Sequence, residues 1–300
     1  MNALRAPFPW FGGKSRAAHL VWEALGDVAN YVEPFAGSAA VLLARPHAPR
    51  CETINDRDGM VANFWRAVKA APVEVAHHTD WPVNEADLHA RHRWLIGQRE
   101  SLTERLIADP EWFDVRVAGW WCWGACAWIG DGWCVKESRR LPFFGNTGMG
   151  VHSARGADWQ QLSRRLATVD VACGDWSRVS SPTVVLRAAG TAGVYLDPPY
   201  AEGAQQYAAG GTGSALSAEV RAWCEEHGSN PRMRIVLSGY EGEHDALQRR
   251  GWRVVEWRAT GAGYVAAGGE RTNQRRERLW FSPHCVGARQ LGLFDAGGAR

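Results

Sequence analysis

The run with the clearest chemical meaning is Asp197-Pro198-Pro199-Tyr200, which follows the apolar residues 193–196 (GVYL). A strand that ends in a rigid Pro-Pro turn holds a carboxylate, a backbone carbonyl and an aromatic ring together. Open α/β sheets bind their ligands at this carboxyl edge. The same run can also be an ordinary turn. If it is functional, it offers two hydrogen-bond acceptors and a stacking ring to one ligand.

A second run, residues 31–40 (YVEPFAGSAA), is typical of a strand, a tight turn of small residues and a helix. Gly37 lets a ligand approach the backbone, and the helix N-terminus after it offers free N–H groups. Some ~20 residues later, Asn55-Asp56 ends the next predicted strand, where an acidic side chain accepts hydrogen bonds from ribose hydroxyls. The turn is not the GxGxxG fingerprint, but the two features together indicate a cofactor that contains a nucleoside.

A third run, residues 7–14 (PFPWFGGK), precedes the first predicted strand. Gly12 and Gly13 allow a close backbone approach, and Lys14 supplies a cation that suits a carboxylate. Trp10 can cover an apolar or aromatic group. Taken alone, this run is better explained as a Gly-Gly turn with a solvated lysine.

The elements that must position these runs alternate between strand and helix at both ends of the chain. Predicted strands cover residues 29–35, 51–56, 169–173, 193–196, 234–238, 252–257 and 277–281, and predicted helices cover 38–44 and 59–70. We expect an α/β fold with a parallel or mixed sheet, built from residues 1–70 and 169–288. Residues 71–168 form a mostly helical insertion in this prediction, and residues 289–300 form a flexible tail.

In chain order, PFPWFGGK, YVEPFAGSAAV, IND, LDPPY, IVLSGY and RLWFSPH strongly resemble the Dam-like DNA adenine-N6 methyltransferases. The resemblance covers residues 7–70 and 169–284. It implies a Rossmann-like methyltransferase sheet with helices on both faces, S-adenosyl-L-methionine as cofactor and double-stranded DNA as substrate. In this family a target-recognition insertion precedes the DPPY motif. Residues 71–168 lie outside the resemblance, so the target sequence is not predicted.

Position by position, the resemblance assigns Trp10 and Lys14 to the methionine end of the cofactor. It places Asp56 on the ribose hydroxyls, Asp175 near the cofactor's adenine, and Asp197 beside both the methyl donor and the target base. The other cofactor-binding candidates are Gly12, Gly13, Glu33, Pro34, Phe35, Ala36, Gly37 and Ser38, where Ser38 replaces a glycine that is frequent in the family. The catalytic candidates are Asp197, Pro198, Pro199 and Tyr200, and no metal ligand is predicted.

The expected chemistry suits these residue types. The N6 lone pair of adenine is conjugated into the ring, so this amine is a poor nucleophile. Asp197 and the Pro198 carbonyl can accept its two N–H hydrogen bonds and stabilise the positive charge that develops. N6 is unreachable inside a duplex, so the base must flip out, and Tyr200 can stack on it. A cytosine-N4 methyltransferase, which usually has Ser in place of Asp197, and an inactive DNA-binding protein with this fold remain alternatives.

Several other signals bear on partners. Seven cysteines at irregular spacing suit reduced thiols, and the spacing of Cys122, Cys126 and Cys134 does not favour zinc. The tryptophans of residues 112–133 fit the core of the insertion better than a base-stacking platform. Residues 249–278 hold eight Arg against three Glu, which favours contact with DNA phosphates over a solvated rim.

The whole chain has ordinary globular composition, with 46% hydrophobic and 22% charged residues and a net charge of +2. No apolar run approaches the ~18 to 20 residues of a membrane span, and the start has no signal-peptide layout. We therefore expect a protein of the cytoplasm of a bacterial or phage-infected cell. Two Gly-rich segments, residues 201–214 and 260–269, are either ligand-ordered lids or plain loops.

The tail contains Gln290, Leu291, Leu293 and Phe294 in the order QLGLF. This pattern resembles the pentapeptide that binds the bacterial sliding clamp. A tail that packs on its own domain explains the same residues equally well. The sequence does not decide between a restriction-modification enzyme, a phage enzyme and a solitary one.

Overall fold

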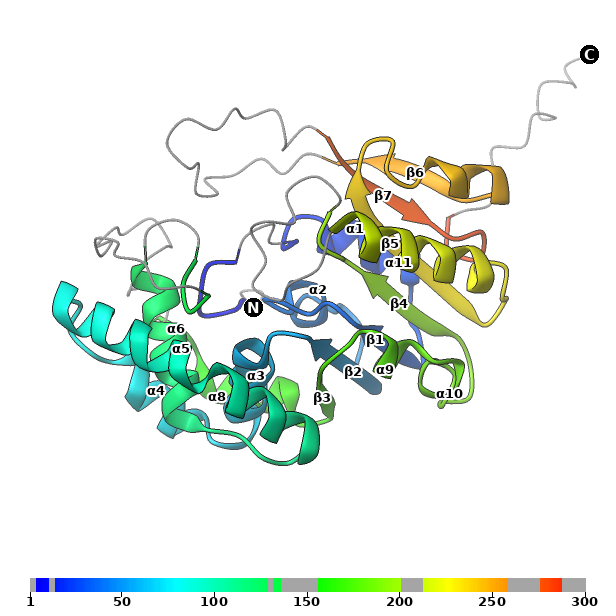
Figure 1. Ribbon diagram of the computed structural model, residues 1–300. Coiled ribbons are helices and arrows are strands. Elements are labelled where there is room, and N and C mark those ends of the chain that lie inside the picture. The colour runs from blue at the N-terminus through cyan, green and yellow to red at the C-terminus, as the bar shows by residue number, and fades with distance from the viewer. Residues whose placement is uncertain are drawn as a thin grey trace, which may run out of the picture.

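The computed structural model describes residues 4–10, 14–128, 132–135, 156–200, 213–257 and 276–287. Over these residues the chain forms a seven-stranded sheet flanked by helices (Figure 1). The strands are β1 (Asn30–Glu33), β2 (Cys51–Asp56), β3 (Val169–Cys173), β4 (Ala192–Leu196), β5 (Met233–Tyr240), β6 (Arg253–Glu256) and β7 (Glu277–Phe281). Their order is β3-β2-β1-β4-β5-β7-β6. Only β7 runs antiparallel to its neighbours, so the expected mixed sheet of a Rossmann-like methyltransferase fold is confirmed.

The two faces of the sheet are covered by different helices, because successive strand residues point to opposite sides. Tyr31 and Tyr195 pack on one face with α1 (Ala18–Leu25), α2 (Ala40–Leu43) and α3 (Gly59–Ala70). Val32 and Val194 pack on the other face, where the helices are α9 (Ser177–Ser180), α10 (Pro182–Val185) and α11 (Gly213–His227). In Figure 1, α11 accordingly lies in front of the sheet and α1 behind it.

The sheet brings the predicted site residues to one edge. Parallel pairing sets Glu33 beside Ile54 and Val32 beside Val194. The carboxyl ends of β1, β2 and β4 therefore meet at the same edge of the sheet, where open α/β sheets bind ligands. The strands themselves are rigid supports, because β1 and β4 are buried along their whole length.

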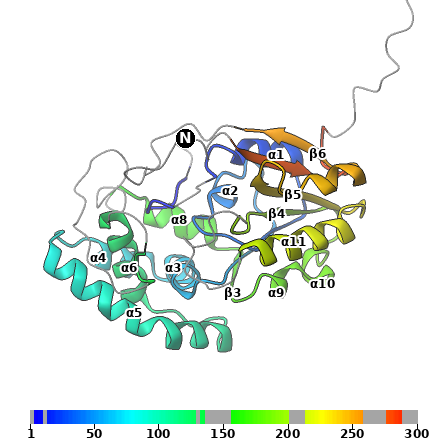
Figure 2. The ribbon, with the colours of Figure 1, turned by 45° about the horizontal axis from the view of Figure 1, so that its top comes forward.

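Residues 71–168 are helical wherever the structure describes a regular element. The helices are α4 (Pro72–Thr79), α5 (Glu85–Ala108), α6 (Val115–Ala127) and α8 (Trp159–Leu166). Figure 2 shows α4, α5 and α6 gathered beside α3, away from α9 and α10. Trp121, Trp123 and Trp128 are buried among these helices, which supports the interpretation of the tryptophan cluster as core.

Two arginines tie the helices of residues 71–168 to the sheet domain. From α3, Arg66 donates to the carbonyls of Leu106, Asp109 and Trp112 at the end of α5. From α8, Arg165 pairs with Glu52, a fully buried carboxylate of β2, at 2.6 Å. These bonds satisfy carbonyls and a carboxylate that burial would otherwise penalise. The inserted helices and the sheet thus share one packed core.

Two predicted bounds are wrong at the first turn. The predicted helix over 38–44 is the shorter α2, because Ala39 before it has φ 49° and cannot be helical. The predicted strand over 29–35 ends at Glu33, since Pro34 cannot donate a ladder hydrogen bond. Both corrections lengthen the turn at the edge of the sheet.

The remaining expectations concern membranes, metals and cysteines. None of the described helices combines the length and the apolar composition needed to cross a membrane. Among the described residues, no group of His, Cys, Asp and Glu side chains is placed to hold a metal ion. All seven cysteines are free thiols, and all except Cys51 are buried.

Candidate functional site

The turn after β1 is built around Gly37, and three groups fix it in place. Its φ of 47° lies in the left-handed region, and a Cβ there would lie 2.3 Å from Nε1 of Trp10. The Trp65 indole donates to its carbonyl at 2.9 Å, and its own N–H donates to Asp56 Oδ2 at 2.9 Å. Only glycine fits this position. The turn therefore joins Trp10 and Asp56, two residues that the sequence assigned to the same cofactor.

Asp56 ends β2 and accepts a second backbone hydrogen bond, from Asp58 N–H to Oδ1 at 2.8 Å. Burial, followed by the charge of Asp58, raises the pKa of Asp56 to about 7. Asp58 is held by Arg99 of α5 through two bonds of 2.7 and 2.9 Å. Hydroxyl donors would stabilise the charged form of such a carboxylate. Asp58 is also the N-cap of α3, a role that its residue type indicates in the sequence. Arg99 was not predicted, because no local pattern shows that it pairs with Asp58.

Glu33 is the last residue of β1, just before the turn, and its side chain is buried. Its Oε2 accepts from the Tyr31 hydroxyl at 2.9 Å and from the Leu42 N–H at 3.2 Å. Burial raises the pKa of Glu33 to about 8, and the nearby charge of Asp197 acts in the same direction. The bond from Leu42 fastens β1 to α2, and the bond from Tyr31, also on β1, holds the carboxylate in place, so Glu33 supports the turn.

Asp197 follows β4 and sits in a buried charge cluster. Lys14 Nζ lies 3.0 Å from Asp197 Oδ1 and 3.8 Å from Glu277 Oε2 on β7. The Tyr200 hydroxyl donates to Asp197 Oδ1 at 3.3 Å. Burial raises the pKa of Asp197, whereas Lys14, Tyr200 and Ser238 lower it. The ammonium group thus offsets the tendency of burial to neutralise this carboxyl.

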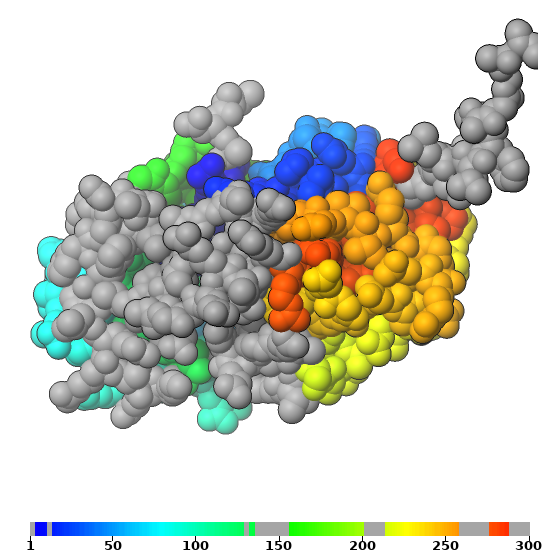
Figure 3. Space-filling model, turned by 90° about the horizontal axis from the view of Figure 1, so that it is seen from above, coloured from blue at the N-terminus to red at the C-terminus, as the bar shows by residue number. Residues whose placement is uncertain are grey.

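Lys14 contacts Asp197, a pairing that the sequence had not predicted. Its Nζ also lies 5.1 Å from the centre of the Tyr200 ring. Figure 3 shows the blue N-terminal segment beside the orange and red surface of β6 and β7. Glu277 joins the candidate site without having been predicted from the sequence, and one of its oxygens is buried without a hydrogen bond. No motif marks it, because it reads as an ordinary strand residue.

The Tyr200 ring is buried against a second tyrosine. It meets Tyr240 of β5 at 4.5 Å between ring centres and an angle of 62°. Ser238, two residues earlier on β5, bonds the Tyr195 hydroxyl at 2.8 Å. The IVLSGY motif therefore supplies two residues beside the DPPY run. The sequence had quoted this motif without giving its residues a role.

Asp175 lies at the carboxyl end of β3, exposed, where its Oδ1 accepts from the Ser177 N–H at 3.0 Å. Beside it, Trp176 stacks on Phe35 with ring centres 6.0 Å apart and planes at 25°. This aromatic pair links the turn after β1 to the end of β3. Trp176 was missed, and its only sequence signal is its place one residue after Asp175.

The other predicted residues divide into two groups. Pro34, Ala36 and Ser38 lie buried in the turn, and Pro198 and Pro199 follow Asp197. Within the turn the strained non-glycine position is Ala39 rather than Ser38. Gly12 and Gly13 lie outside the described residues, as do the tail residues 290–294 and most of the two Gly-rich segments.

Comparison with known proteins bears on the first third of the chain. Residues 10–93 match the family described as D12 class N6 adenine-specific DNA methyltransferase. This stretch includes Trp10, Lys14, the turn around Gly37 and Asp56. A search of curated proteins found no match to the chain. Together with the seven-stranded mixed sheet, the match confirms the resemblance expected from the sequence, and the chain carries the D12 class pattern of N6 adenine-specific DNA methyltransferases over residues 10–93.

Proposed function

We propose that the protein transfers the methyl group of S-adenosyl-L-methionine to the N6 amine of an adenine flipped out of double-stranded DNA. The observation that carries this proposal is the position of Asp197. Its carboxylate emerges from β4 at the edge that also holds the Gly37 turn, and it lies 3.0 Å from a buried ammonium group. The family match supports adenine-N6 methylation of DNA in general.

The residues around the turn fit the cofactor by the chemistry of their groups. Asp56 is a carboxylate whose pKa is raised to about 7 by burial, so ribose hydroxyl donors would stabilise its charged form. Gly37 leaves no side chain between the backbone and a ligand, and Trp10 lies directly against it. The Phe35–Trp176 pair gives an aromatic surface beside Asp175 for the adenine ring. When bound, the cofactor supplies a methyl group that is activated as a sulfonium.

Asp197 and the Pro198 carbonyl would accept the two N6–H hydrogen bonds of the target adenine. The nitrogen lone pair is then available to form the bond to the methyl carbon. An acceptor in a buried site stabilises the developing positive charge more strongly than water does, because the local dielectric is low. This role needs an ionised carboxyl group. Lys14 favours that state, since its charge lowers the pKa of Asp197 and partly offsets the larger effect of burial, which raises it.

Lys14 has a double role in this proposal. Its ammonium group bridges Asp197 and Glu277 at 3.0 and 3.8 Å. It is the last residue of the PFPWFGGK run, and the resemblance assigned it, with Trp10, to the methionine end of the cofactor. We propose that Lys14 positions Asp197 from below and also attracts the cofactor's carboxylate, so that one cation serves both substrates.

Two alternatives make different predictions. A cytosine-N4 methyltransferase would use the same edge for another exocyclic amine, and an inactive relative would bind DNA without modifying it. An Asp at position 197, where cytosine-N4 enzymes usually have Ser, favours adenine as the target. The pairing of Asp197 with Lys14 favours an active enzyme over an inactive relative.

The test is to incubate purified protein with S-adenosyl-L-methionine and DNA that lacks modified bases, and then to analyse the nucleosides by mass spectrometry. We expect N6-methyladenine with the wild type and none with Asp197→Ala. N4-methylcytosine would overturn the choice of base. No modified base from a folded, cofactor-binding protein would overturn the activity itself. Sequencing that detects modified bases would then give the target sequence.

The proposal extends to the cellular setting expected from the sequence, a bacterial or phage-infected cytoplasm. There we propose that Gln290, Leu291, Leu293 and Phe294 dock on the sliding clamp, which the QLGLF pattern supports. Pull-down with purified clamp tests this directly. Equal retention of the wild type and of the double variant Leu293→Ala, Phe294→Ala would leave the tail without a role in docking.

A further inference from the structure

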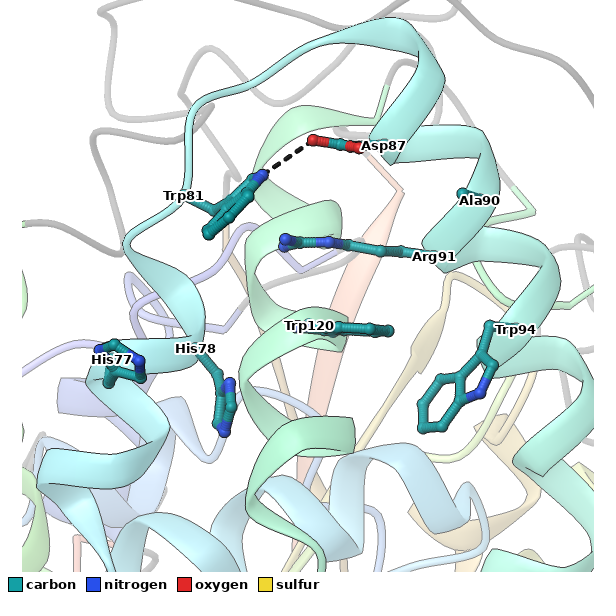
Figure 4. A pocket seen from close by; sticks show the side chains of 8 residues that line it. All are labelled: His77, His78, Trp81, Asp87, Ala90, Arg91, Trp94 and Trp120. Atoms are coloured by element: carbon teal, nitrogen blue, oxygen red, sulfur yellow. Dashed lines mark hydrogen bonds between the residues drawn. The ribbon is translucent and has the colours of Figure 1, made fainter.

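A cavity of about 560 Å³ lies between α4, α5 and α6, outside the site described above (Figure 4). Its walls include Trp81, Trp94 and Trp120, together with His78 and Arg91. Figure 4 shows these side chains converging from the three helices and from the segment between α4 and α5. The volume lies within the range of small-molecule binding pockets. The lining combines flat aromatic rings with one cation, Arg91, and one carboxylate, Asp87, which accepts from the Trp81 indole at 2.8 Å. Aromatic rings beside a cation suit a planar heteroaromatic ligand.

The helices approach closely enough to form this cavity because α6 has glycine where it crosses α4. A Cβ on Gly119 would lie 2.2 Å from the Cβ of His78 and 2.9 Å from the carbonyl of Val75. Glycine inside a helix costs about 1 kcal/mol relative to alanine. Here the close packing of α4 on α6 explains its presence. The close packing of α4 on α6 at Gly119 therefore fixes this wall of the cavity.

Arg91 is the chemical centre of the pocket. Its guanidinium lies 5.1 Å from the Trp81 ring, 4.7 Å from the Trp120 ring and 4.4 Å from the Trp123 ring. The residue is only 8% exposed, and its Nη1 is buried with no hydrogen-bond partner. A buried donor without a partner is costly, so an acceptor placed in the pocket would recover that cost.

Trp94 and Trp120 provide the flat surfaces. Their rings meet edge to face at 5.1 Å, and both remain half-exposed. The exposed Arg116 lies over both rings, at 4.7 and 5.5 Å. After burial, the charges of His77, Arg116 and Arg91 lower the pKa of His78. The pocket is thus aromatic and open to solvent; it is lined by one cation, Arg91, and one carboxylate, Asp87, with Arg116 over the rings at its side.

We propose that this pocket holds a second nucleobase of the DNA substrate, one displaced from the stack and distinct from the methylated adenine. The base would stack on the Trp94 ring, meet the Trp120 ring edge to face and present a ring or carbonyl acceptor to Arg91 Nη1. Guanine offers two such acceptors, O6 and N7, to an arginine. Aromatic side chains stack on unpaired bases of any sequence. This inference rests on the proposed function for its choice of DNA as the partner.

The pocket is connected to the cofactor edge through α6. Trp121, the next residue after Trp120, packs against Phe8 at 4.8 Å and Trp10 at 6.3 Å. Successive helix residues point in directions about 100° apart, so Trp120 faces the pocket while Trp121 faces the N-terminal segment. Trp10 in turn lies against Gly37. A base in the pocket would therefore press on the same helix that backs the cofactor turn.

A nucleobase explains the lining better than a phosphate does. Phosphate sites use several donors that converge on the oxygens. This pocket offers one buried donor among aromatic rings. A free nucleotide shares the chemistry of a DNA base, and the experiment must separate these two sources.

The experiment measures DNA binding by fluorescence anisotropy with two labelled single-stranded probes. One contains guanine and thymine but no adenine, so that it offers no methylation target. The other has the same backbone with abasic sites in place of the bases. We expect Trp94→Ala to weaken binding of the first probe about tenfold and binding of the abasic probe less than about twofold, as loss of one stacking partner predicts. Trp94→Phe, which keeps a stacking ring, should stay close to the wild type.

The matched control is Trp112→Ala. Trp112 is also half-buried, lies in the segment between α5 and α6 and is covered by an arginine, Arg105, at 4.5 Å, but it lies outside the pocket. Equal weakening for both probes, equal weakening by the control, or no weakening by Trp94→Ala would each overturn the proposal. Guanosine monophosphate that binds through Trp94 when the base-containing probe does not would overturn DNA as the source.

The two proposals fail separately. Methyl transfer is assayed on the same preparations with adenine-containing duplex DNA. Base-dependent binding without methyl transfer would support the base pocket and overturn the proposed function. Methyl transfer without base-dependent binding through Trp94 would support the proposed function and overturn the base pocket.

Discussion

Replacing Gly37 by alanine should destabilise the turn that joins Trp10 and Asp56, the proposed cofactor residues. Alanine at φ 47° enters the left-handed region, which costs ~1 to 2 kcal/mol. The new methyl group would also lie 2.3 Å from Trp10 Nε1 and 2.7 Å from its Cε2, so the indole must shift. Overpacking of this kind costs ~1 to 3 kcal/mol. We therefore expect Gly37→Ala to lower the free energy of unfolding by ~2 to 5 kcal/mol.

Gly242→Ala is the matched control. Gly242 also has a positive φ, 84°, but a Cβ there would meet nothing within 4 Å. Its substitution therefore reports the backbone cost alone. The difference between the two variants isolates the contact with Trp10. A second check is the double variant Gly37→Ala, Trp10→Ala, which should recover the part of the loss that comes from the clash.

Urea unfolding gives the free energies, and calorimetry with S-adenosyl-L-methionine gives the cofactor affinity. Displacement of Trp10 should weaken cofactor binding even at low temperature, where the variant is folded. The reasoning is refuted if Gly37→Ala loses no more stability than Gly242→Ala. It is also refuted if the stability losses of Gly37→Ala and Trp10→Ala simply add in the double variant, because a relieved clash would make the combined loss smaller than their sum.

Other predictions concern the charged groups. Asp197→Asn should abolish methyl transfer while the unfolding midpoint stays close to that of the wild type, and retained turnover would contradict its role. Asp56→Ala should weaken cofactor binding by about tenfold or more in calorimetry, because it removes a charged hydrogen-bond acceptor. Lys14→Met should shift the acidic limb of the kcat profile to higher pH, since it removes the group that lowers the pKa of Asp197, and an unchanged limb would exclude this. The pKa of Glu33 is raised to about 8, so the folded state binds its proton more tightly than the unfolded state. Stability from this group should fall as the pH rises from about 5 to 9, and Glu33→Gln should flatten that fall in urea unfolding.

The sheet could be predicted from the sequence because its strands are short apolar runs with clear ends. The bounds of β2 and α3 match the prediction, and Asp58 between them is a recognisable N-cap. β3 and β7 also match. By contrast, nothing in the sequence indicates the positive φ of Ala39, because glycine is the residue type that predicts this conformation. Local patterns thus predicted the regular elements and missed the strained turn.

The site was predicted as a set of runs but not as a set of contacts. Trp10, Gly37 and Asp56 were each assigned to the cofactor, yet nothing in the sequence indicates that the indole lies against the glycine. The pairing of Lys14 with Asp197 joins residues that are far apart in the sequence, and it depends on the packing of the whole sheet. Pairings of this kind depend on tertiary structure, which composition and spacing do not encode locally.

The inserted helices take part in the architecture of the cofactor edge as well as in the proposed recognition of DNA. Arg99 of α5 holds Asp58 by two bonds, Asp58 donates its N–H to Asp56, and Asp56 accepts from the Gly37 N–H. On the opposite side, Trp121 of α6 backs Trp10. Movement of α5 on binding DNA would therefore act on Asp56 through Asp58, and movement of α6 would act on Trp10. This arrangement provides a physical route by which binding at the helices could alter the cofactor site, with Asp56 and Trp10 as the two residues through which the change would pass.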